Sequence, residues 1–213
     1  MNFNVTFGYK KKTKLFDELE FNIDENKITV VCGHNGAGKT TLLKLVSGVL
    51  PSNLKNAKGW YVPASGGLIQ HFSLREHLNI LKEKQNEKTK ILVDRAYELF
   101  SIKDFENSRI SKLSTGQGML AAIIVAIASN SDFILFDEPF GSLDPTNAEN
   151  LSTLLKMLSK SGKTIIITSH DLFLTAETAD NVIFIKNGQI SWQSDNTKEL
   201  DVEYLKEMYR LYA

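Results

Sequence analysis

Residues 33–40 carry the pattern in this chain that is best suited to chemistry on phosphates: two glycines separated by four residues, then a lysine and a threonine. Glycines let backbone N–H groups wrap around a polyphosphate, and a helix that starts at such a loop adds the positive end of its dipole. Lys39 would bring a mobile positive charge to the outer phosphates, and the Thr40 hydroxyl would bind Mg²⁺. The alternative is a glycine-rich turn with a chance lysine. The residues expected to contact the nucleotide are Gly33, His34, Asn35, Gly36, Ala37, Gly38, Lys39, Thr40 and Thr41.

Acidic side chains and a histidine follow two further apolar runs. Asp137 and Glu138 end the run at 133–136, and His170 comes shortly after the run at 164–168. Adjacent acids at the end of an apolar strand are often functional, although a solvated loop pair and a structural histidine are the simpler alternatives. If both runs are parallel strands, these side chains lie at the strand ends where ligands bind in such sheets, beside the glycine-rich loop.

The elements that must hold these groups alternate between strands and helices. Apolar β-branched runs predict buried strands, and helical spacing predicts the segments between them. This alternation predicts an α/β fold with a mostly parallel sheet and right-handed crossovers. Thr146 and Glu149 have the spacing of a capping box, so we expect a helix to start there. The expected strands cover 3–7, 19–23, 27–32, 59–63, 133–136, 164–168, 182–185 and 189–192, with hairpins at both ends of the chain, a basic turn at 10–14 and a terminal helix at 198–212.

A helical insert is expected between two parts of this core, over about residues 68–128. Ser73 and Glu76 have capping-box spacing, and apolar residues then recur at helical intervals, with a charged break at 83–90. The change from strand-like to helical spacing predicts a unit of its own, held by the β-rich core on both sides.

Composition narrows the class of protein. The 213 residues fit one sizeable domain, and Lys plus Arg balance Asp plus Glu at 25 each, so no global charge favours nucleic acid as a partner. Cys32 is the only cysteine, which suits the cytosol and predicts a small buried side chain. The N-terminus lacks the layout of a signal peptide, and the longest apolar run, 119–128, is too short to cross a bilayer. We therefore expect a chain that does not span a membrane by itself.

Four motifs follow the glycine-rich loop, and together they resemble the ATP-binding cassette (ABC) ATPases over essentially the whole chain. They are Leu-Ser-Thr-Gly-Gln at 113–117, the acidic pair at 137–138, Ser-Leu-Asp at 142–144, and His170. The chain has no Asn-Lys-x-Asp motif, which counts against a GTPase.

The resemblance implies an architecture and an assembly. It implies one ABC ATPase domain over 1–213, with a P-loop NTPase (RecA-like) core at about 1–67 and 129–213. An N-terminal antiparallel β-subdomain and a helical subdomain at about 68–128 complete it. It also implies a head-to-tail dimer of two ATPase subunits, a homodimer in the simplest case, with two ATP molecules buried between them.

The resemblance also assigns roles to residues. Glu138 corresponds to the general base that polarises the attacking water, and His170 to the switch histidine at the γ-phosphate. Tyr9 corresponds to the aromatic that stacks on adenine, with Phe7 as a possible substitute. The implied catalytic residues are Lys39, Glu138 and His170, and the implied metal ligands are Thr40 and Asp137. The implied nucleotide contacts beyond the loop are Tyr9, Ser114, Gly116, Gln117 and Asp144. Of these, Ser114 and Gly116 would contact the γ-phosphate of the ATP that the partner subunit binds.

Three departures from the family pattern concern coupling. Ala64 stands where the family usually has the glutamine that senses Mg²⁺ and the membrane partner. In the segment 113–117, which corresponds to the family's signature motif, Thr115 replaces a glycine. Gly118 and Met119 replace the polar and basic residues that usually follow this motif. The segment at 66–72 has an apolar surface at the border of the helical insert, and we expect it to dock the membrane partner.

The function that the resemblance implies is hydrolysis of ATP, with Mg²⁺, to drive a separate transmembrane permease subunit. The chain would then be cytoplasmic and peripheral, bound to the inner face of the membrane through the permease, and the short cassette with an altered coupling segment favours export weakly. Two alternatives stay open: a regulatory nucleotide-binding module with little hydrolysis, and a soluble ABC ATPase that acts on DNA or ribosomes. The second alternative usually has coiled coils or two cassettes in one chain, and this sequence has neither.

Overall fold

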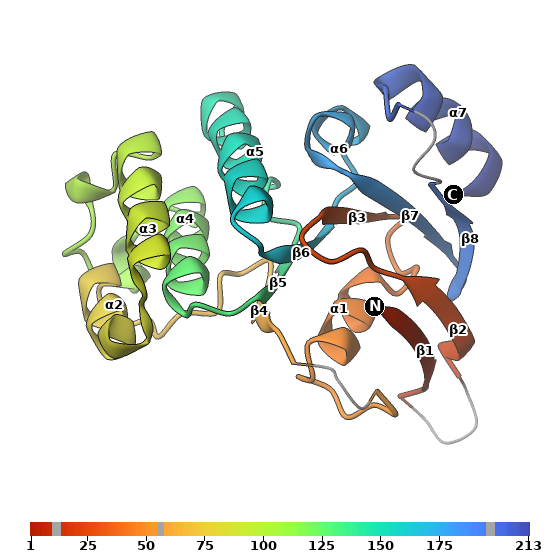
Figure 1. Cartoon of the computed structure of the whole chain (residues 1–213), viewed down its shortest axis with the longest axis horizontal. Coiled ribbons are helices and arrows are strands. Elements are labelled where there is room, and N and C mark those ends of the chain that lie inside the picture. The colour runs from red at the N-terminus through yellow and green to blue at the C-terminus, as the bar shows by residue number, and fades with distance from the viewer. Residues whose placement is uncertain (10–13, 55–57, 195–198) are drawn as a thin grey trace.

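The computed structural model describes residues 1–9, 14–54, 58–194 and 199–213, and its strands form two sheets. A small antiparallel sheet pairs β1 (Asn2–Phe7) with β2 (Phe16–Asn22). A larger sheet has the strand order β4-β5-β6-β3-β7-β8, in which all neighbours are parallel except the antiparallel pair β7-β8 (Figure 1). Its strands are β3 (Ile28–Cys32), β4 (Trp60–Val62), β5 (Phe133–Asp137), β6 (Thr164–Thr168), β7 (Asn181–Lys186) and β8 (Gln189–Gln193). The predicted α/β fold with a mostly parallel sheet is confirmed.

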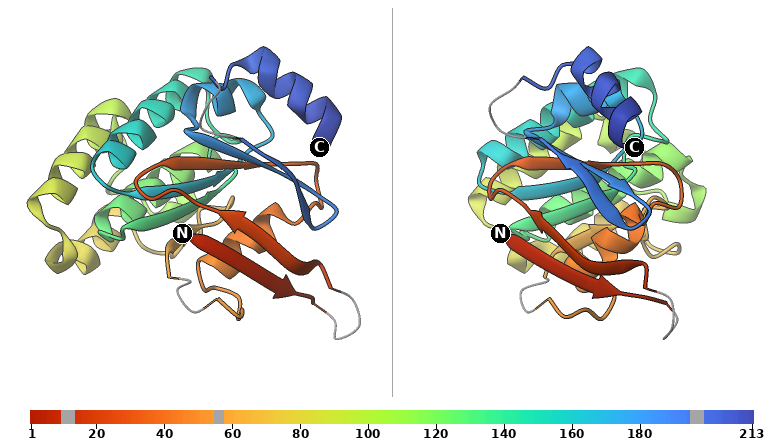
Figure 2. Two further views of the ribbon diagram at one scale, coloured as in Figure 1. Left: turned by 45° about the vertical axis from the view of Figure 1, so that its right-hand side comes forward. Right: turned by 90° about the vertical axis from the view of Figure 1, so that its right-hand side faces the viewer.

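Helices cover both faces of the larger sheet. On one face lie α1 and the β1-β2 hairpin, and on the other lie α5, α6 and α7 (Figure 2). The three central strands β3, β5 and β6 are buried at every position, which is why their sequences are apolar on both faces rather than alternating. The α-helices are α1 (Lys39–Val46), α2 (Leu74–Leu81), α3 (Glu87–Leu99), α4 (Thr115–Ala128), α5 (Pro145–Lys160), α6 (Leu172–Thr178) and α7 (Val202–Tyr212), with short 3₁₀ turns at Lys82–Lys84, Ile102–Asp104 and Ile110–Lys112.

The helices α2, α3 and α4 pack on one another at one end of the molecule, on the left in Figure 1. Ser73 caps α2 through the predicted capping box with Glu76. The apolar run 119–128 is buried throughout, which explains why α4 shows little amphipathic pattern. No helix within the described ranges is long and apolar enough to cross a membrane. The division at about 68 and 128 into a core and a helical subdomain stays a prediction.

Two local predictions were wrong. Helix α5 begins at Pro145, with Asp144 as its N-cap, and not at Thr146, because the Asp144 carboxylate accepts a hydrogen bond of 2.9 Å from the Asn147 backbone N–H. The predicted break at 83–90 is present but ends earlier, since Asn86 caps α3 and the helix starts at Glu87. In both cases the helix starts earlier than predicted, because a residue that makes a good N-cap, Asp144 or Asn86, lies upstream of the predicted start.

Both predicted hairpins are present. The basic turn between β1 and β2 lies largely outside the described residues, whereas the turn at Asn187 and Gly188 has φ of 50° and 74°, as a tight hairpin requires. A Cβ atom at Gly188 would collide with the Leu15 carbonyl oxygen, just before β2. Only glycine therefore fits at this position of the hairpin. The chain from Leu15 is thereby held against the sheet, next to the glycine-rich loop.

Candidate nucleotide and metal site

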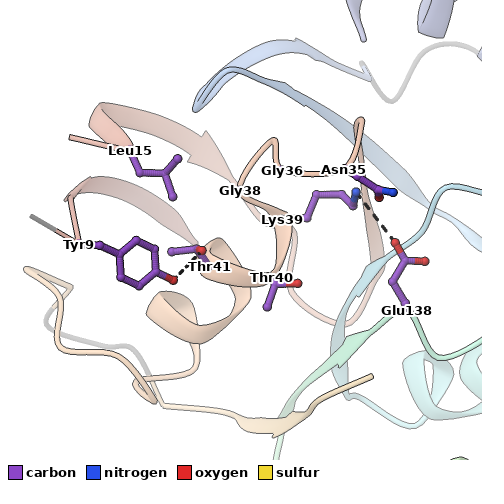
Figure 3. Close-up of a pocket in the computed structure, with 9 residues that line it drawn as sticks. All are labelled: Tyr9, Leu15, Asn35, Gly36, Gly38, Lys39, Thr40, Thr41 and Glu138. Carbon is purple, nitrogen blue, oxygen red and sulfur yellow. Dashed lines mark hydrogen bonds and ion pairs between the residues drawn. The ribbon is translucent and has the colours of Figure 1, made fainter. Parts of the chain in front are cut away.

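The glycine-rich loop joins the buried end of β3 to the first turn of α1. Gly38 is the N-cap of α1 with φ 109°, a conformation that favours glycine. The loop borders a cavity of about 410 Å³ (Figure 3). The cavity is lined by Tyr9, Leu15, Asn35, Gly36, Gly38, Lys39, Thr40, Thr41 and Glu138. Eight of these nine were predicted as site residues, and Leu15 is the addition.

Lys39 is held inside the loop by the loop's own carbonyl groups. Its Nζ donates to the carbonyl oxygens of Gly33 at 2.7 Å and His34 at 3.3 Å, and the side chain is buried. The nearest carboxylate oxygen is Oε1 of Glu138, at 4.0 Å. The ammonium thus has neutral acceptors at hydrogen-bond distance and an ion pair only at 4.0 Å, and a phosphate group in the cavity would supply a closer anion.

The Asp137 carboxylate, at the end of β5, receives three hydroxyl groups. Thr40 Oγ1 donates to its two oxygens at 2.8 and 3.0 Å, Thr168 Oγ1 donates to Oδ1 at 2.7 Å, and the Tyr61 hydroxyl donates to Oδ2 at 3.1 Å. Asp137 is only 5% exposed. Burial, followed by the neighbouring carboxylate of Asp137, raises the pKa of Tyr61, so its hydroxyl stays protonated and acts as a donor.

These groups fit a Mg²⁺ ion. A hydroxyl and a carboxylate are hard oxygen ligands, and Mg²⁺ is usually held by one or two protein oxygens together with substrate phosphates and water. No cluster of three or more His, Cys, Asp or Glu that could hold a metal occurs among the residues that the structure describes. Thr40 and Asp137, which are in direct contact, are the two side chains that would hold the ion.

Glu138 follows directly and has an unusual backbone. Its φ is 50°, which is uncommon for a residue with a side chain, and its N–H donates to Thr168 Oγ1 at 2.8 Å. Oε2 of Glu138 lies 2.9 Å from Nδ1 of His170, which follows β6. Strained backbone of this kind is found at functional sites, where the surrounding structure must hold it. Glu138 and His170, both expected at the ends of strands, are thus in direct contact.

The signature residues form a second cavity, of about 540 Å³, whose lining shares no residue with the first. Ser114 and Gln117 form a reciprocal capping box at the start of α4. A Cβ atom at Gly116 would lie 2.8 Å from the Ser142 carbonyl oxygen, which explains the glycine. Asp144 lines the same cavity, and its hydrogen bonds from the Asn147 backbone and side chain lower its pKa.

Tyr9 extends the first cavity away from the loop. The side chain is 66% exposed, shares a hydrogen bond of 2.9 Å with Thr41 Oγ1, and meets Phe7 edge to face at 5.0 Å between ring centroids. Tyr9 lines the cavity and Phe7 does not. His34, Gly33 and Ala37 belong to the loop but not to the lining of the cavity, and the His34 ring contacts the Asn35 carbonyl oxygen instead.

Sequence reasoning missed two residues, Tyr61 and Thr168, that bind the Asp137 carboxylate. Thr168 closes an apolar run, and Tyr61 lies inside a three-residue strand, so neither has a local motif. Cys32 is buried as predicted, and burial raises the pKa of its thiol to about 12. Taken together, a parallel sheet, a glycine loop that leads from β3 into a helix, and an acid at the end of β5, two strands away in the same sheet, define a P-loop nucleoside triphosphatase.

Comparison with known proteins identifies the family. The family model for ABC transporters matches residues 16–141, more than half of the chain. An uncharacterized ABC transporter ATP-binding protein of Methanocaldococcus jannaschii, MJ1023, is 31% identical over 195 residues, which are 88% of this chain and 73% of that protein. Carnitine transport ATP-binding protein OpuCA of Listeria monocytogenes is 31% identical over 88% of this chain, which spans about half (53%) of it. Petrobactin import ATP-binding protein YclP of Bacillus subtilis is 28% identical over 97% of this chain and 90% of its own length.

Solved structures share the fold. The dimeric post-hydrolysis structure of the ATP-binding cassette MJ0796, bound to ADP and Pi, has a TM-score of 0.77 and 22% identity, over 93% of this chain and all (100%) of that one. A bacterial Atm1-family ABC exporter with ATP bound has a TM-score of 0.77 and 18% identity, over 97% of this chain and 39% of that one. The match to the family model and the 31% identity with the Methanocaldococcus protein show that the chain belongs to the ABC transporter family, and within that family it is an ATP-binding ATPase subunit.

Proposed function

We propose that this subunit binds ATP with Mg²⁺ at the first cavity, hydrolyses it between two subunits, and drives a separate transmembrane permease. One observation carries the proposal: Lys39, the Thr40–Asp137 pair and the Glu138–His170 pair converge from β3, β5 and β6 at one edge of the sheet. Ligands of parallel sheets bind at the carboxyl ends of the strands, where these groups lie. The chemistry that fits them is in-line attack of water on a terminal phosphate.

Each side chain has a separate task in this reaction. Lys39 exchanges its loop carbonyls for the outer phosphates. Thr40 and Asp137 would hold Mg²⁺, which would offset phosphate charge when bound. Glu138 orients and polarises the water, and His170, in contact with Oε2 of Glu138, holds that carboxylate in place. Tyr9 offers an exposed ring for adenine at the far side of the cavity.

The second cavity supports a head-to-tail dimer. The start of α4 at Ser114 presents backbone N–H groups and a positive dipole end, but it belongs to a different cavity from Lys39 of the same chain. The Ser142 hydroxyl, in the lining of this second cavity, is buried without a hydrogen-bond partner among the described residues. A partner subunit whose nucleotide faces Ser114 would satisfy this surface, and two such contacts related by a twofold axis would close the dimer.

The permease would dock beside the helical unit at about 68–128. Ile69 is 52% exposed, and Phe72 lies half-buried with its ring edge-on to His77. Ala64 lies exposed in the turn before this segment and has no group that could reach the metal site. Contact with the permease would therefore run through apolar packing at Ile69 and Phe72. The proposal includes a position of the subunit on the cytoplasmic face of the membrane, bound there through the permease.

The direction of transport is a separate matter. Export, which the sequence favoured weakly, stays a prediction and is not confirmed. Among the relatives, the petrobactin protein is named for import, while the Atm1-family structure is an exporter with the same fold. The ATPase chemistry proposed here is common to both directions.

Thermal unfolding with ATP and Mg²⁺ tests the nucleotide site. A ligand bound only by the folded state stabilises it, so ATP at about one hundred times its Kd should raise the Tm by about 5–10 °C. Lys39→Ala should lose most of this shift, because the buried ammonium is the phosphate partner. Lys44→Ala, in the last turn of the same helix and outside the cavity lining, is the matched control and should keep the shift. An equal shift in Lys39→Ala and wild type would mean that ATP binds elsewhere.

A further inference from the structure

Tyr61 brings a polar group to the metal site from a strand on which the sequence predicts no site residue. Its hydroxyl oxygen lies 3.1 Å from Oδ2 of Asp137. The remainder of the side chain packs, half-buried, against the apolar cluster beneath α1. The ring is therefore fixed by packing, and the hydroxyl is aimed at one carboxylate oxygen.

The pairing of strands explains this aim. In the parallel pair β4-β5, Tyr61 lies opposite Leu135, so both side chains point to the α1 face of the sheet. Asp137, two residues after Leu135, points to the same face. On the other side of β5, Thr168 lies opposite Asp137 itself. The carboxylate is thus flanked by hydroxyl groups from both neighbouring strands, and Thr40 approaches from the helix above it.

Each oxygen of the Asp137 carboxylate accepts from one donor of its own, and the two oxygens share Thr40. Oδ1 accepts from Thr168 at 2.7 Å, Oδ2 accepts from Tyr61 at 3.1 Å, and Thr40 spans both oxygens at 2.8 and 3.0 Å. Thr40 is also the side chain whose hydroxyl would bind Mg²⁺. When Thr40 turns its oxygen to a metal, one fixed donor stays on each carboxylate oxygen: Thr168 on Oδ1 and Tyr61 on Oδ2.

We propose that Tyr61 is a positioning residue for the metal site, which holds Oδ2 of Asp137 in place so that Mg²⁺ is bound when Thr40 releases the carboxylate. The inference rests on the proposed function, because it takes Thr40 and Asp137 as the metal ligands. It also assigns β4 a part in that site through Tyr61, since Ala64, which follows the strand, has only a methyl group to offer.

Metal binding, measured without turnover, tests the proposal. The protein is loaded with ADP and titrated with Mn²⁺, and free Mn²⁺ is measured from its electron paramagnetic resonance signal. Tyr61→Phe keeps the ring and removes one oxygen, and it should weaken Mn²⁺ binding roughly tenfold, as is typical for loss of a group that orients a metal ligand. Tyr97→Phe is the matched control: Tyr97 is also half-buried and its hydroxyl also lies near a carboxylate, that of Glu106, but it is on α3, so the substitution should leave Mn²⁺ affinity unchanged.

Further arms separate this inference from the proposed function. ADP affinity in excess chelator should be the same in Tyr61→Phe and wild type, and saturating Mg²⁺ should restore the ATPase rate of Tyr61→Phe. Unchanged Mn²⁺ affinity in Tyr61→Phe, alongside weakened binding in Asp137→Asn, would overturn the role of Tyr61 and leave the proposed function standing. Unchanged affinity in Asp137→Asn as well would overturn the metal site itself, and with it both proposals.

Discussion

Glu138→Gln should slow ATP turnover by about 10²- to 10⁴-fold while leaving ATP binding intact. An amide has the shape of the carboxylate, and it keeps a hydrogen bond to His170, but it cannot accept the proton of the attacking water. The variant should therefore accumulate in the state that precedes hydrolysis. In size-exclusion chromatography with ATP and Mg²⁺, it should elute as a dimer at concentrations where the wild type, which clears its ATP, elutes as a monomer.

A second glutamate serves as the control for this prediction. Glu98, on α3, is exposed and pairs with Arg95 at 2.7 Å, so Glu98→Gln makes the same chemical change away from both cavities. Its turnover should match that of the wild type. Wild-type turnover in Glu138→Gln would show that another group is the base, and a Glu138→Gln variant that stays monomeric with ATP would count against the dimer.

Gly33→Ala should destabilise the folded chain by about 3 kcal/mol or more, from overpacking and backbone strain together. Gly33 has φ 154°, and an added Cβ would lie 2.3 Å from the carbonyl oxygen of Ile185 on β7. That oxygen belongs to the backbone of the strand beside β3, so it cannot move without shifting the sheet. Urea unfolding without nucleotide measures the loss.

Gly118→Ala is the matched control for Gly33→Ala. Gly118 lies inside α4, and an added Cβ would meet nothing within 4 Å. Because alanine is the better helix former, this substitution should leave stability unchanged or raise it by up to about 1 kcal/mol. A Gly33→Ala variant that unfolds at the wild-type urea concentration would mean that the loop can be rebuilt away from Ile185.

The parts of the site that could be predicted from sequence are those with local signals. The glycine-rich loop can be recognised from the spacing of its glycines and lysine. Asp137 and Glu138 follow the apolar run 133–136, which predicts a buried strand or helix segment. The contact between Glu138 and His170 then follows from fold class, because the ends of adjacent parallel strands meet. Order in the chain was therefore enough to place the main groups.

Other features depend on register and on competing local signals. The contact of Tyr61 with Asp137 requires β4 to pair with β5 in one particular register, which no short pattern specifies. The start of α5 was misplaced because two signals competed, and Asp144 with proline after it prevailed over the capping-box spacing of Thr146 and Glu149. The Asp144 carboxylate, which was predicted to contact the nucleotide, accepts hydrogen bonds from the Asn147 backbone and side chain at the start of α5.

In the proposed dimer, each catalytic site combines Lys39 and Glu138 of one subunit with Ser114 of another. Lys39→Ala and Ser114→Arg should each be inactive alone, the first for lack of the phosphate partner and the second because a bulky side chain blocks the start of α4. Mixed in equal amounts, they form some dimers with one intact site, and phosphate release should recover to about a quarter of the wild-type rate if subunits pair at random. A mixture that stays as inactive as its components, although each variant folds and Ser114→Arg still binds ATP, would mean that the two subunits do not share a catalytic site.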